Sequence, residues 1–209
     1  MSYDPSDAAW DEAYERLAEE LYPHQAKQAI REFTSGRLQS YYLSNPEITR
    51  PGFRVQAEAR ALLKHGHHSA SLVFAASAAE QFLRVALLRP VVYGLIHLQP
   101  LADLVVEAAL AQTGYVRYTK LLAGLFRELT LVEITSIKRP GRAIPLLTEA
   151  SSLQARRNEV VHRGDDVPAS EATTAVAISA CIFLHVLTPA LSALDLQVHE
   201  GLVVKYRDA

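Results

Sequence analysis

Apolar residues recur every three or four positions along most of the chain, which is the spacing of amphipathic helices. The spacing is clearest over residues 7–21, 53–64, 69–88, 101–111, 115–129 and 145–163. Alternation with a period of two, which would indicate strands, is confined to the last fourteen residues. The pattern therefore predicts an all-α protein.

Turn-forming residues interrupt the helical pattern between residues 36 and 52. Gly36, Asn45, Pro46, Pro51 and Gly52 all lie in this stretch. We therefore expect a boundary near residue 50, with an N-terminal helical extension over 1–50. A helical bundle of four to five core helices is expected over 51–195, followed by a C-terminal tail over 196–209.

Residues 129–145, LTLVEITSIKRPGRAIP, have no helical period and are expected to be extended or irregular. Arg139 and Arg142 flank Pro140-Gly141 and form a basic turn. Such a turn is usually only solvated. It would contact an RNA backbone if it lies beside a binding cleft.

Residues 172–194 contain no formally charged side chain and are long enough to span a bilayer. Polar residues interrupt the segment, however, among them His185, Thr188 and Pro189. We interpret it as a helix capped by Ser170 and buried in the bundle or at a subunit interface, and we expect no membrane span.

Composition narrows the classes of function. The 209 residues carry a formal net charge of −2, so contact with a polyanion must be local. The one cysteine, Cys181, excludes an internal disulfide and a thiolate metal cluster. The first residues are acidic and lack an apolar core, so a cytoplasmic location is expected. Residues 65–68, HGHH, are interpreted as a helix end, and no metal or other cofactor is expected.

The candidate chemistry lies in RRNEVVHRG, residues 156–164. Asn158 and His162 are four residues apart and share a helical face, whereas Arg157 and His162 are separated by about 140°. Gly164 is well placed to end the helix after His162. Arg156 and Arg163 add positive charge, for which a phosphate group is the natural ligand.

The spacing of arginine and histidine alone is weak evidence, because Arg60 and His65 have it too. An asparagine directly after the arginine is rarer, since asparagine occurs only at positions 45 and 158. The residue types also fit this chemistry, because metal-independent RNA cleavage needs an acid–base group and a positively charged side chain that contacts the phosphate. His162 and Arg157 supply these groups.

Arg157-Asn158-x3-His162, followed by Arg163-Gly164 and an apolar helix, resembles the HEPN superfamily. The resemblance covers roughly residues 53–195 and implies a helical bundle that dimerises to form one cleft from two motifs. Many members are metal-independent endoribonucleases, often toxins or anti-phage effectors, and others are inactive binding or assembly modules. It implies a homodimer, an RNA substrate, an antitoxin or nucleotidyltransferase-like partner, and Glu80 as a residue that positions Arg157.

A purely structural interpretation of the same residues stays open. Arg157 would then pair with Glu80 or Glu159 and hold two helices together, while His162 would act as a donor at the helix end. The sequence thus leaves three hypotheses: a ribonuclease, an inactive module of the same fold, and a structural helical protein.

Overall fold

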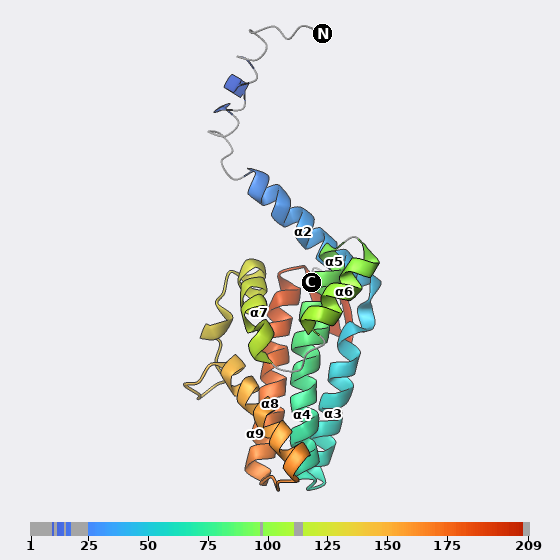
Figure 1. The fold of residues 1–209 in the computed structure, drawn as a ribbon, viewed down its shortest axis with the longest axis vertical. Helices are drawn as coiled ribbons and strands as arrows, with labels where there is room; N and C mark the ends of the chain where they lie inside the picture. The colour runs from blue at the N-terminus through green and yellow to red at the C-terminus, as the bar shows by residue number, and fades with distance from the viewer. Residues whose placement is uncertain are drawn as a thin grey trace. The chain divides into compact units, whose positions relative to one another are not determined.

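The computed structural model describes residues 10, 12–14, 16–17, 25–96, 98–110 and 115–206. Contacts divide the chain into two units, Met1–Arg37 and Leu38–Ala209. The second unit contains all the candidate site residues. Its described part is all-α except for one two-stranded hairpin, which confirms the predicted fold class (Figure 1).

The α-helices are α2 (Gln25–Ser44), α3 (Arg50–Lys64), α4 (His68–Glu80), α5 (Arg89–Leu95), α6 (Gln99–Leu110), α7 (Tyr115–Thr130), α8 (Leu146–Arg163), α9 (Ala169–Ile182) and α10 (Thr188–Ser192). Short 3-10 helices cover Pro46–Thr49 and Ile134–Ser136, and π-helical segments cover Gln81–Leu88 and Phe183–Leu187. The strands β1 (Leu196–His199) and β2 (Leu202–Lys205) pair antiparallel. The predicted helix over 7–21 lies largely outside the described residues.

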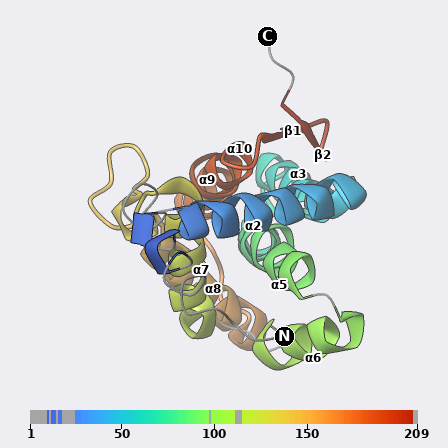
Figure 2. The same ribbon diagram turned by 90° about the horizontal axis from the view of Figure 1, so that it is seen from above.

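Helices α3, α4, α8 and α9 pack side by side and form the bundle (Figures 1 and 2). Helices α4 and α9 contact each other, and both bury alanines completely, among them Ala75, Ala79 and Ala172. Alanines let helix backbones approach closely, so the alanine-rich composition of both helices explains why they form the centre of the bundle.

Two prolines follow the π-helical segments and lie inside continuous helical stretches. Pro90 has no N–H to donate to the carbonyl of Ala86, four residues earlier, and a regular helix would clash there. The wider π turn accommodates the ring. The Tyr42 hydroxyl donates to the Ala86 carbonyl at 2.7 Å and so satisfies it. The helical pattern was expected to end near residue 88, but the helical stretch continues through Pro90 to Leu95.

The expected boundary near residue 50 must move. Helix α2 runs through Gly36 to Ser44, and its residues Leu38 and Tyr42 are buried in the core of the second unit. The tail also belongs to this unit, because Leu196 and Val203 of the hairpin are fully buried. The range 51–195 is therefore too narrow, since buried contacts extend the compact unit on both sides.

The hairpin confirms the strand character of the tail. It lies beside α10 and α3 in Figure 2. The Thr49 hydroxyl donates to the Gly201 carbonyl at 2.8 Å and ties the hairpin to the start of α3. Ser170, in contrast, does not cap α9, because the helix begins one residue earlier and its cap position is occupied by Pro168.

Two helical stretches, His68–Leu95 and Ala169–Ser192, are long and apolar enough to cross a membrane by length and composition. Within their most apolar windows, 61% and 44% of the residues are buried in the protein. Core helices of soluble proteins have the same composition, so the fold is compatible with a soluble protein. The segment over 172–194 is part of the bundle, as expected.

Candidate functional site

The motif lies in the last two turns of α8. Pro145 precedes the helix, and Gly164 ends it with a left-handed φ of 72° and an N–H that donates to the Val160 carbonyl at 3.0 Å. Glycine adopts this conformation without a steric penalty, so the sequence defines the end of the helix. His162 and Arg163 are exposed in the final turn. The helix stays regular up to Arg163.

This regularity fixes the directions of the motif side chains. The buried residues Leu153 and Val160 mark the packing face of α8. On a regular helix Arg157 begins about 40° from Leu153, at the edge of that face, whereas His162 lies about 180° away. Arg157 and His162 of one chain are therefore separated by about 140°, as the spacing predicts.

A hydrogen bond redirects the Arg157 guanidinium. Its Nη1 donates to Oδ1 of Asn158 at 3.0 Å. Asn158 shares a face with His162, one turn further on, so this bond draws the guanidinium toward that face. Within the described part of the chain no ion pair joins Arg157 to Glu80 or Glu159. The contacts required by the structural interpretation of Arg157 are therefore not present among these residues.

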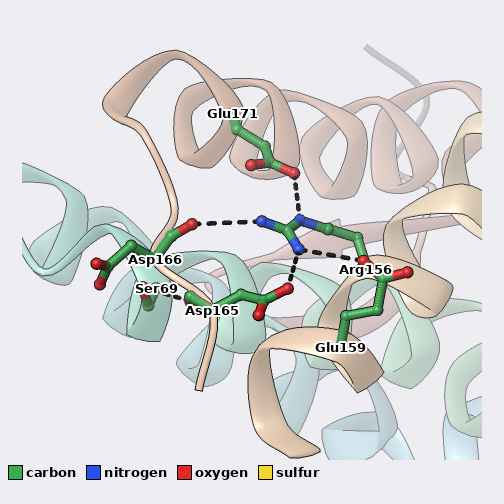
Figure 3. A network of polar contacts seen from close by, with 6 residues as sticks. All are labelled: Ser69, Arg156, Glu159, Asp165, Asp166 and Glu171. Carbon is green, nitrogen blue, oxygen red and sulfur yellow. Dashed lines mark hydrogen bonds and ion pairs between the residues drawn. The ribbon is translucent and has the colours of Figure 1, made fainter. Parts of the chain in front are cut away.

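The neighbouring Arg156, unlike Arg157, donates hydrogen bonds to acidic side chains (Figure 3). Its Nε donates to Glu171 at 2.8 Å, and its Nη1 donates to Asp165 at 2.7 Å and to Glu159 at 3.1 Å. Hydrogen bonds to these carboxylates, Glu171 first, raise the pKa of Arg156. The guanidinium is permanently charged, and three acids neutralise it.

This network ties four segments together, namely α8, the loop after it, α9 and, through Ser69, α4. Arg156 also donates to the Asp166 carbonyl at 3.3 Å, and the Ser69 hydroxyl on α4 donates to the Asp165 carbonyl at 3.5 Å (Figure 3). The end of α8 is thereby joined to the loop after it and to α9. Arg156 was expected to add positive charge around His162. It instead anchors the helix end, because the acids of this loop surround it.

Glu80 was expected to position Arg157, but its observed partner is Arg84. The Arg84 Nη1 lies 2.9 Å from the Glu80 carboxylate, one turn away on the same helical stretch, and both side chains are partly buried. Tyr118 of α7 lies near this pair. Its burial, with a contribution from Glu80, raises the pKa of Tyr118 to about 12. Glu80 therefore belongs to a cluster between α4 and α7.

The two arginines of the basic turn also differ. Arg139 forms two hydrogen bonds with Glu149 of α8, at 2.7 and 2.6 Å, and both side chains are about 10% exposed. The hydrogen bonds to Glu149 raise the pKa of Arg139. Arg139 thus anchors the turn to α8. Arg142 is exposed and takes part in no ion pair among the described residues.

Cys181 lies half-buried on α9, and burial raises the pKa of its thiol, which disfavours the reactive thiolate.

The carboxylates around Arg156 were missed by the sequence reasoning. Asp165 and Asp166 directly follow the helix-ending Gly164, and this position was the signal that could have indicated them.

No family model, curated protein or solved structure matches this chain. The motif and its geometry are therefore the basis for any functional assignment.

Proposed function

We propose that this chain is a HEPN-type, metal-independent endoribonuclease whose active site is built from Arg157, Asn158 and His162 of two protomers. The observation that carries the proposal is the contrast between adjacent arginines. Arg156 gathers the nearby carboxylates, whereas the only side-chain partner of Arg157 in the described part of the chain is the neutral Asn158. A guanidinium without an acidic partner retains its capacity to bind phosphate.

The surface beside Arg157 has the same character. His162 and Arg163 are exposed at the C-terminal end of α8, where the helix dipole favours positive charge. Among the described residues Arg163 takes part in no ion pair. Arg157 and Arg163 therefore place positive charge locally around the end of α8, on a chain with a net charge of −2. A local surface of this kind suits contact with one or two phosphates rather than broad RNA binding.

The reaction would be an internal transesterification of RNA. One imidazole removes the proton of the ribose 2′-hydroxyl, whose oxygen attacks the adjacent phosphorus. The bond from phosphorus to the 5′-oxygen breaks, and a second imidazole protonates that leaving oxygen. The products are a 2′,3′-cyclic phosphate and a 5′-hydroxyl. Arg157 stabilises the charge that accumulates on the phosphate oxygens.

A dimer supplies what one protomer lacks. The reaction uses a base and an acid, and α8 carries a single histidine, His162. A two-fold axis beside the motif would bring His162 of the partner subunit to the same phosphate. It would also compensate for the 140° between Arg157 and His162, because arginine and histidine would come from different protomers. We propose a homodimer on this basis.

The experiment compares two matched histidine variants. His162→Ala should abolish RNA cleavage in EDTA and leave the melting temperature nearly unchanged, because an exposed side chain contributes little packing. His65→Ala is the control, since His65 is also exposed at a helix end and also follows an arginine by five residues. Equal cleavage by His162→Ala and His65→Ala would contradict the proposal, as would a monomeric active protein.

The second candidate is an inactive RNA-binding or assembly module of the same fold. The observation that favours it is the regular helix through Arg163, which keeps Arg157 and His162 of one chain apart. This module would bind RNA through Arg157 and Arg163 without cleaving it. Binding without cleavage across several RNAs would favour this candidate. In that case a role as a toxin or anti-phage protein, or with a nucleotidyltransferase-like partner, would consist of binding or assembly and not of RNA cleavage.

A further inference from the structure

A cleft lies far from the motif, where the C-terminal end of α2 meets the π-helical segment and α5. Its volume is about 720 Å³, and its walls include Tyr41, Ser44, Asn45, Arg89, Tyr93 and Gln99. This volume is typical of small-molecule sites, which range from about 300 to 1,000 Å³. All of these residues belong to the unit Leu38–Ala209.

Two tyrosines form an aromatic wall of the cleft. The rings of Tyr41 and Tyr93 are nearly parallel, with an interplanar angle of 5° and centroids 6.0 Å apart. Both lie partly exposed. Burial is the main reason that the pKa of Tyr41 is raised, so its hydroxyl stays a neutral hydrogen-bond donor at physiological pH. A flat ring can stack on such a surface.

The positive charge of the cleft comes from Arg89. Its guanidinium carbon lies 6.0 Å from the centroid of the Tyr93 ring, and no carboxylate pairs with it among the described residues. Two of the nearby acids have other partners, since Glu47 pairs with Arg50 at 2.7 Å and Asp103 accepts from Tyr93 at 2.9 Å; Glu107 lines the adjoining pocket beside Arg89 without an ion pair to it among the described residues. Arg89 can therefore bind an anion.

The polar wall offers both donors and acceptors. The Asn45 amide donates to the Tyr41 carbonyl at 2.9 Å, which leaves its Oδ1 as an acceptor. Gln99 donates to Asp103 at 3.2 Å and retains its own Oε1. Ser44 adds an exposed hydroxyl. This combination of stacking surface, guanidinium and mixed amides matches a ligand with a flat polar ring and one phosphate.

We propose that this cleft binds a nucleoside monophosphate, with the base against Tyr41 and Tyr93 and the phosphate on Arg89. The site is separate from the motif. Ser69 contacts the loop after α8, and Arg89 lies twenty residues further along the same helical stretch, which corresponds to about 30 Å. Binding here therefore does not depend on RNA cleavage at His162.

Isothermal titration calorimetry tests the proposal with adenosine, guanosine, cytidine and uridine 5′-monophosphates. At least one should bind the wild-type protein more tightly than about 1 mM, and its nucleoside and inorganic phosphate should each bind at least tenfold more weakly. The comparison among these ligands uses only the wild-type protein, so the test does not depend on how well any variant folds.

Variants assign the two halves of the ligand. Arg89→Gln should weaken nucleotide binding at least tenfold and leave nucleoside binding unchanged. Tyr93→Leu should weaken both ligands, whereas Tyr93→Phe should retain the affinity that comes from stacking. Arg142→Gln, an exposed arginine outside the cleft, is the control and should bind like the wild type.

Failure of all four nucleotides to bind at about 1 mM would overturn the proposal. Equal affinity for a nucleotide and its nucleoside would remove the assignment of Arg89 as the phosphate ligand. Equal affinity for a nucleotide and inorganic phosphate would remove the aromatic half of the site. Unchanged affinity in both Arg89→Gln and Tyr93→Leu would place the ligand elsewhere.

Discussion

The hydroxyl of Tyr42 provides a quantitative test of how the fold accommodates Pro90. Tyr42 is 2% exposed, and its hydroxyl donates to the Ala86 carbonyl at 2.7 Å. Tyr42→Phe removes this donor and leaves a buried carbonyl without it. A buried polar group left unsatisfied costs about 1–3 kcal/mol. For a protein of this size each kcal/mol corresponds to about 2–4 °C, so the melting temperature should fall by roughly 2–12 °C.

The assay is thermal or chemical unfolding of the variant beside Tyr206→Phe, whose ring is 56% exposed and which should change stability by less than about 0.5 kcal/mol. Pro90→Ala sharpens the test, because it restores a backbone N–H in the neighbourhood of the Ala86 carbonyl. The cost of Tyr42→Phe should then be smaller in the Pro90→Ala background. Equal costs in the two backgrounds would refute the link between the proline and the tyrosine hydroxyl.

Three further predictions concern the site and its surroundings. Asn158→Ala should lower RNA cleavage without lowering stability, and Asn158→Asp should weaken RNA binding as well, since it adds a negative charge; wild-type behaviour of both variants would remove Asn158 from the site. Gly164→Ala should destabilise the protein by about 1–2 kcal/mol in urea unfolding, because its φ is 72°. The raised pKa of Tyr118, about 12, means that stability is lost as the pH rises from about 10 to 12, where only the unfolded tyrosine ionises. Tyr118→Phe should reduce this slope in unfolding measured against pH.

The sequence predicted the helical class and most helix positions, because a period of three to four residues reports directly which face is buried. Helices α6, α7 and α8 lie close to the expected ranges 101–111, 115–129 and 145–163. Gly164 was correctly placed at the end of α8, since its left-handed backbone has a strong residue preference. These features depend on local interactions.

Predictions that depend on tertiary contacts were less accurate. Gly36 was interpreted as a break and the helix over 69–88 was expected to end before Pro90, yet helical structure continues through both residues, because burial of Leu38 and the bond from Tyr42 outweigh the local preference. The unit boundary moved for the same reason. Local propensity does not report such long-range compensation.

The partners of charged residues were the least predictable feature of the site. Arg156 and Arg157 are adjacent, but on a helix they point about 100° apart. Arg156 faces the carboxylates of α9 and of the loop that follows α8, whereas Arg157 donates a hydrogen bond to Asn158. A sequence reports that both are arginines and does not report which one meets the acids. That difference decides which arginine can bind phosphate.

The chemical ends of the RNA products test the central claim most directly. Wild-type protein incubated with RNA in EDTA should yield fragments with 2′,3′-cyclic phosphate and 5′-hydroxyl ends, identified by mass spectrometry. His162→Ala, prepared in the same way, should yield none. Fragments with 3′-hydroxyl and 5′-phosphate ends, or cyclic phosphate ends in equal amount from His162→Ala, would contradict cleavage by the Arg157-Asn158-His162 motif.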